Sequence, residues 1–65
     1  MKLLLNGEPI NTEAETLDAV LIENGYADAT VATAVNGEFV PATLRKAHTL
    51  NAGDQIEVLA PMQGG

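Results

Sequence analysis

Apolar and polar residues alternate along several short segments of the chain, and two Asn-Gly pairs join these segments into hairpins. Asn-Gly accepts the positive φ angles of a two-residue hairpin turn, so Asn6-Gly7 and Asn36-Gly37 each predict a β-hairpin. The strands that flank these turns are residues 2–5 and 8–11, and residues 31–35 and 38–40. Pro9 has no backbone donor, which predicts that the second strand lies at a sheet edge.

Between the hairpins, residues 16–25 have the spacing of an amphipathic helix. Leu17, Val20 and Leu21 fall on one face at helical spacing. Thr16 is a suitable N-cap, and Gly25 is a suitable C-terminal stop. A helix this short needs a sheet to pack on.

The remaining segments complete the sheet. Residues 42–50 have no clean period and predict a short helical turn, whereas residues 55–60 predict a last strand. The order of elements predicts an α+β fold, with one main helix packed on one face of a mixed five-stranded sheet. The first and last strands are the most apolar, so we expect them to be central neighbours.

Residues 1–60 form the predicted folded domain, with an aliphatic core. The predicted core residues are Met1, Leu3, Leu5, Ile10, Leu17, Val20, Leu21, Val31, Thr33, Val35, Phe39, Leu44, Ile56 and Val58. On the third strand, the alternation also allows Ala32 and Ala34 to face inward. Leu4 and Leu59 fall on the face away from the helix, where they form either a docking patch or isolated apolar surface.

Composition and charge exclude several classes of function. The chain has 65 residues, three basic side chains and a net charge of -6, which argues against binding to nucleic acid or to an anionic membrane surface. The chain has no cysteine and no apolar run long enough to span a bilayer. We therefore predict a cytoplasmic protein whose partners have basic docking faces.

A conventional catalytic or metal site is not predicted. His48 is the one histidine and lies in a polar stretch, so we interpret it as a loop side chain rather than a general base. The acidic residues are dispersed, without the spacing of a calcium loop. We therefore predict no catalytic residue, no bound cofactor and no metal.

The candidate chemistry lies instead at residues 61–65, which we predict to be a flexible tail. Pro61 ends the last strand, and the tail continues through Met62, Gln63, Gly64 and Gly65. A carboxylate is a poor acyl donor until it is adenylated by ATP, and glycine permits close backbone approach inside a narrow enzyme channel. The alternative is that the Gly-Gly pair is incidental.

Three segments resemble the ThiS family, the sulfur carriers of thiamin biosynthesis. They are LLLNGE at residues 3–8, AVNGEFVP at residues 34–41 and AGDQIEVLAPMQGG at residues 52–65. The resemblance runs nearly end to end, and the chain length favours this family over the longer small subunit of molybdopterin synthase. The family often has Arg after this Val-Pro pair, whereas this chain has Ala42.

The resemblance implies a β-grasp, ubiquitin-like fold and a carrier that is not itself an enzyme. It implies that an E1-like enzyme uses ATP to adenylate Gly65 and that a sulfur donor, such as a cysteine desulfurase, converts it to a thiocarboxylate. Thiazole synthase then takes the sulfur. Gly64, Gln63 and Met62 would enter the partner's active site, and Leu4 and Leu59 would belong to the docking face.

Three alternatives remain open from the sequence. The sulfur acceptor could belong to molybdopterin or cysteine biosynthesis, because the chemistry at Gly65 is the same. The chain could instead be a ubiquitin-like modifier that forms an isopeptide bond to lysine. The third alternative is a binding module whose tail has no role.

Overall fold

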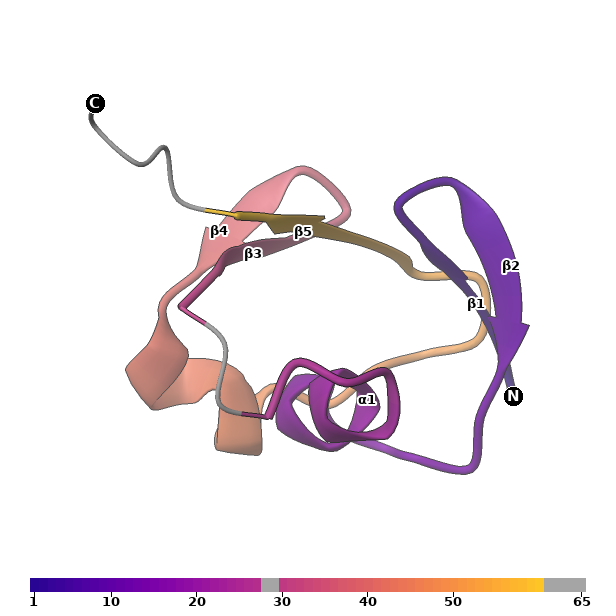
Figure 1. Cartoon of the computed structure of the whole chain (residues 1–65). Coiled ribbons are helices and arrows are strands. Elements are labelled where there is room, and N and C mark those ends of the chain that lie inside the picture. Colours follow the sequence, from indigo (N-terminus) through magenta and orange to yellow (C-terminus); the bar gives the residue numbers. More distant parts are fainter. Residues whose placement is uncertain (28–29, 61–65) are drawn as a thin grey trace.

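Two hairpins and a central strand build one mixed sheet, which curves around an α-helix (Figure 1). The structure, a computed structural model, describes residues 1–27 and 30–60. The elements are β1 (Lys2–Leu5), β2 (Glu8–Asn11), α1 (Leu17–Glu23), β3 (Ala32–Val35), β4 (Glu38–Val40), the 3₁₀ helix η1 (Ala42–Ala47) and β5 (Gln55–Leu59). The five strands are ordered β2-β1-β5-β3-β4. The predicted α+β architecture is therefore confirmed.

The strand pairing follows from the turns and from Pro9. β1 and β5 are neighbours, as predicted, and run parallel, and both predicted hairpins are present as antiparallel pairs. β2, which contains Pro9, lies at one edge of the sheet. Asn6 and Asn36 have φ angles of 50° and 52°, each followed by a glycine with positive φ, which is the geometry of a type I′ turn.

Helix α1 begins and ends at the residues that the sequence indicates. The Thr16 Oγ1 accepts a hydrogen bond from the Ala19 N–H at 3.3 Å, which caps the N-terminus. At the other end Gly25 has a φ of 89°, and the Tyr26 N–H donates to the Leu21 C=O at 2.8 Å. Together with the bond from the Gly25 N–H to the Ile22 C=O at 3.2 Å, this is a Schellman motif with glycine in the αL conformation, and Tyr26 packs against the core beside it.

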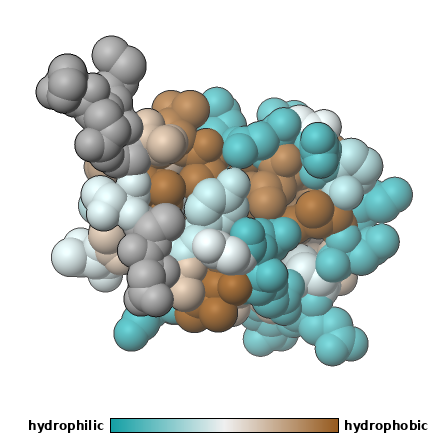
Figure 2. Space-filling model, viewed as in Figure 1, coloured by the Kyte–Doolittle hydropathy of each residue, from teal (hydrophilic) through white to brown (hydrophobic). Residues whose placement is uncertain are grey.

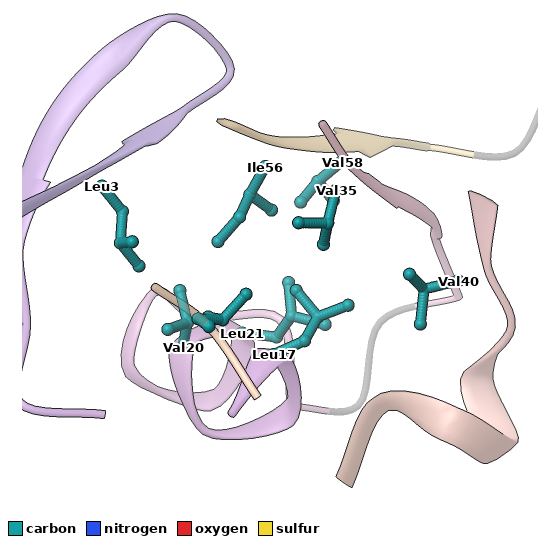
Figure 3. Close-up of a cluster of buried hydrophobic side chains, with 9 residues drawn as sticks. Leu3, Leu17, Val20, Leu21, Val35, Val40, Ile56 and Val58 are labelled. Carbon is teal, nitrogen blue, oxygen red and sulfur yellow. The ribbon is translucent and has the colours of Figure 1, made fainter. Parts of the chain in front are cut away.

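The core fills the space between the sheet and α1, where side chains of both layers point toward one another (Figure 3). Its buried apolar residues are Leu3, Leu17, Val20, Leu21, Val35, Val40, Leu50, Ile56 and Val58. Thr33 is also buried, which shows that the third strand turns Thr33 and Val35 inward. Leu5, Ile10 and Val31 are half-buried and pack against this cluster.

Three predicted core residues are exposed, so these predictions were wrong. Met1 is 39% exposed because it precedes β1 at the end of the sheet. Leu44 is 54% exposed because it lies on η1, which buries none of its residues. Phe39 is 69% exposed because it pairs with Ala34, on the opposite side of the sheet from Val35. The sequence prediction also missed two buried apolar residues, Val40 and Leu50.

Candidate functional site

The strand that leads toward the predicted tail lies in the middle of the sheet. β5 pairs with β1 on one side and with β3 on the other. The predicted tail residues Met62, Gln63, Gly64 and Gly65 lie outside the described residues, so their roles stay predictions. The last described residues before them are Val58, Leu59 and Ala60, which we call the β5 exit.

On the β1 side, a side chain continues the hydrogen bonding of the sheet where the strand stops. The β1–β5 ladder ends with the pair Leu5↔Ile56, and the Asn6 N–H then donates to the Ile56 C=O at 2.8 Å. The Asn6 carboxamide pairs with Val58: its Oδ1 accepts the Val58 N–H at 2.8 Å, and its Nδ2 donates to the Val58 C=O at 3.3 Å. The carboxamide therefore forms the two hydrogen bonds that the backbone of a neighbouring strand would form with Val58.

On the β3 side, an arginine forms a hydrogen bond with Thr33, the residue that pairs with Val58. Val58 pairs with Thr33, whose Oγ1 donates to the Val40 C=O at 2.8 Å. The Arg45 Nε donates to the same Oγ1 at 3.0 Å, and the Arg45 Nη2 donates to the Val31 C=O at 2.6 Å. Arg45 therefore ties η1 to β3 next to the β5 exit.

The second turn asparagine holds the opposite end of β5. The Asn36 Oδ1 accepts the Gln55 N–H at 3.0 Å, and its Nδ2 donates to Asp54 Oδ1 at 3.0 Å. The Asp54 Oδ2 accepts the Asn51 N–H at 2.8 Å. The hydrogen bonds from the Asn51 backbone and the Asn36 side chain lower the pKa of Asp54 below its ordinary value, because they favour the charged form.

Beside the β5 exit, apolar side chains lie on the sheet face that points away from α1. Phe39 and Leu59 are 69% and 64% exposed. They flank the small outward-facing residues of β3, because Phe39 pairs with Ala34 and Leu59 pairs with Ala32. We call Ala32, Ala34, Phe39 and Leu59 the outer patch. Figure 2 shows hydrophobic surface toward the upper left, on the side where β4 and β5 lie in Figure 1.

The two leucines predicted for a docking face do not lie together. Leu4 is half-buried and pairs with Gln55, at the other end of β5 from Leu59. Four residues along a strand separate their positions by about 13 Å. Glu57, which shares the outer face with Ala34, lies between them. Leu59 is exposed as expected, but its apolar neighbour is Phe39, which the sequence prediction had placed in the core.

Other site types find little support in residues 1–27 and 30–60. No group of three or more His, Cys, Asp or Glu side chains in this part of the chain is arranged to hold a metal ion. None of its helices has the length and apolar character needed to cross a bilayer. His48 is half-buried at the end of η1, where its backbone C=O accepts the Leu17 N–H at 3.0 Å.

Comparison with known proteins covers nearly the whole chain. The model of the ThiS family matches residues 3–65. The sulfur carrier protein ThiS of Thermus thermophilus is 43% identical over 61 residues, which cover 94% of this chain and 95% of that protein. The thiazole synthase of Paramagnetospirillum magneticum is 39% identical, and that of Magnetococcus marinus is 42% identical, each over 66 residues. This chain spans 20% of the length of each synthase.

Solved structures agree with the fold. The crystal structure of the thiamine biosynthesis protein ThiS from Geobacter metallireducens is 33% identical, with a TM-score of 0.84 and full coverage of both chains. A solution structure of a thiamine biosynthesis protein from the same organism is 29% identical, with a TM-score of 0.76, and covers 100% of this chain and 88% of that one. The two structures match the sheet and helix arrangement over the length of this chain.

Proposed function

This chain belongs to the ThiS family, and we propose that it carries sulfur for thiamin biosynthesis on the carboxylate of Gly65. The observation that supports this most directly is the extent of the family match, which runs from residue 3 through Gly65. The match therefore includes both the β-grasp body and the Gly-Gly pair. The proposal requires that Gly65 be the last residue of the mature protein.

The proposed chemistry divides between the chain and its partners. The Gly65 carboxylate attacks the α-phosphate of ATP in an E1-like activating enzyme, and pyrophosphate leaves. The persulfide of a cysteine desulfurase, or of a similar donor, then displaces AMP and forms an acyl disulfide with Gly65. A thiol of the partner attacks the donor's sulfur in that disulfide, which releases the Gly65 thiocarboxylate and leaves a disulfide between the two partner thiols. The chain provides the acyl group and the partners provide the catalytic groups, so the chain acts as a recycled co-substrate.

The length of residues 61–65 allows the folded domain to bind outside an enzyme's active site while Gly65 reacts inside it. An extended segment of residues 61–65 reaches at most about 17 Å beyond the β5 exit, since each residue adds about 3.4 Å. A body that docks beside an enzyme's active site can therefore place Gly65 inside it. Gly64 and Gly65 lack side chains that would obstruct the approach of the reacting atoms.

The outer patch is the surface that we propose for docking on the activating enzyme. It adjoins the β5 exit through Leu59, so a partner that covers it also meets the start of residues 61–65. Glu57 pairs with Ala34 and so lies next to the patch on the same face, and the chain carries a net charge of -6. We therefore expect the partner surface to have an apolar centre and a basic rim.

Thiazole synthase is the sulfur acceptor that we propose. Two relatives named thiazole synthase each match the whole of this chain within a polypeptide of which it spans 20%. A carrier segment in the same polypeptide as a synthase supports transfer between the two. No observation favours an acceptor of molybdopterin or cysteine biosynthesis, or conjugation to protein lysines.

Reconstitution tests the proposal directly. The protein is incubated with ATP, a sulfur source and an activating enzyme that is shown to modify another ThiS protein. Replacement of one carboxylate oxygen by sulfur raises the intact mass by about 16 Da. A variant that lacks Gly65 keeps the folded body and is the matched control, so its mass should not change. An unchanged mass of the wild-type protein would contradict the proposal.

A further inference from the structure

The two neighbours of β5 end at different places, which leaves the β1 side of the β5 exit dependent on one side chain. β3 pairs with β5 through Leu59, whereas β1 pairs with it only through Ile56. The β1 chain turns away at Asn6, whose φ is 50°. In the described part of the chain, the Asn6 carboxamide is the group from this side that bonds both the N–H and the C=O of Val58.

We propose that Asn6 is a positioning residue for sulfur loading: its carboxamide fixes the β5 exit and thereby the point from which residues 61–65 reach the activating enzyme. The inference rests on the proposed function. Val58 is buried and Leu59 belongs to the outer patch, so the β5 exit connects the core, the docking surface and the start of the tail.

The length of the tail makes a fixed starting point important. If the β5 exit separated from the sheet, the part of the chain that the sheet does not hold would begin at Val58, which adds about 10 Å of extended length before residue 61. Leu59 would also lose its fixed place in the outer patch. A small misplacement of the reacting group is costly in rate even when binding is retained.

Asn36 provides a matched control within the same sheet. Its φ is 52°, its turn also continues with a glycine, and its carboxamide also accepts a β5 backbone N–H. That N–H belongs to Gln55, at the end of β5 away from the β5 exit. Loss of Asn36 therefore removes a similar interaction and leaves the start of the tail in place.

The test compares Asn6→Gly with Asn36→Gly, because glycine accepts the positive φ of both turns. Hydrogen exchange measures the protection of the Val58 amide, and pyrophosphate release by the activating enzyme gives kcat and KM. We expect Asn6→Gly to speed exchange at Val58 by about tenfold, since a hydrogen-bonded pair is lost. We expect kcat to fall by about tenfold, with a smaller change in KM because Phe39, Ala32 and Ala34 keep their places.

Asn36→Gly should leave kcat near the wild-type value. Asn6→Asp is a second variant that keeps an acceptor for the Val58 N–H but loses the donor, so its kcat should lie between those of wild type and Asn6→Gly. An equal fall of kcat in Asn6→Gly and Asn36→Gly, or no fall in Asn6→Gly, would overturn the inference alone. Failure of the wild-type protein to release pyrophosphate would overturn the proposed function as well, which separates the two.

Discussion

Phe39 and Val40 are neighbours on β4, but Phe39 is exposed and Val40 is buried. Replacing each of them by alanine tests the strand register that places Phe39 in the outer patch. Val40 is 4% exposed and pairs with the buried Thr33. Phe39 is 69% exposed and pairs with Ala34. Residue size alone would predict that the loss of Phe39 is the more damaging, whereas the structure predicts the reverse.

The expected free energies follow from the burial of each side chain. Val40→Ala removes two methyl groups at about 0.8 kcal/mol each, and the cavity that remains brings the loss to about 2 kcal/mol. In a chain of 65 residues this lowers the melting temperature by about 10 °C. Phe39→Ala removes an exposed side chain and some strand propensity, so its cost should stay below about 1 kcal/mol.

Urea unfolding of both variants measures these differences, and steady-state kinetics with the activating enzyme measures docking. Phe39→Ala should raise KM by about tenfold, the effect of losing an aromatic contact of about 1.4 kcal/mol. Ile22→Ala is the matched control, because Ile22 is 54% exposed on α1, away from the outer patch. A larger loss of stability in Phe39→Ala than in Val40→Ala would refute the register, and equal KM values for Phe39→Ala and Ile22→Ala would refute the docking surface.

Two further predictions concern the groups that hold the two ends of β5. Arg45→Lys should lower the free energy of unfolding by about 1–2 kcal/mol, because lysine cannot donate to both the Thr33 hydroxyl and the Val31 C=O in the same fork; urea unfolding checks this. Asp54 has a pKa below its ordinary 3.8, so its contribution to stability is present above pH 3.8 and is lost as the pH falls through the lower folded-state value. The free energy of unfolding of Asp54→Ala should therefore be at most about 1 kcal/mol below that of wild type at pH 7, and this difference in urea unfolding should shrink as the pH is lowered below 3.8.

Much of the fold follows from local signals in the sequence. Each Asn-Gly pair fixes a two-residue turn, Thr16 and Gly25 mark the ends of a helix, and Pro9 marks an edge strand. These signals act within a few residues, so they specify element type and the hairpin pairing. The Asn36-Gly37 turn also determines the register of β4. When Val35 faces inward, a two-residue turn places Ala34 and Phe39 together on the outer face. Placing Phe39 in the core was inconsistent with that turn.

The contacts around the β5 exit could not be predicted in this way. Asn6 reaches Val58 across 52 positions of sequence, and Arg45 reaches Thr33 across 12. An Asn-Gly pair indicates a turn whether or not the asparagine side chain also bonds a distant strand. Leu50 is similar, since it lies in a segment without a clean period and is buried because its N–H bonds the Glu15 C=O, beside the start of α1.

The intact mass of the protein isolated from cells that are making thiamin shows whether Gly65 carries sulfur. We predict a chain that ends at Gly65, together with a fraction about 16 Da heavier in which fragmentation places the added mass on that residue. Cells without the activating enzyme should show the unmodified mass alone. A mature chain that continues past Gly65 or ends before it, or a heavier form whose added mass lies elsewhere, would show that Gly65 is not the sulfur carrier.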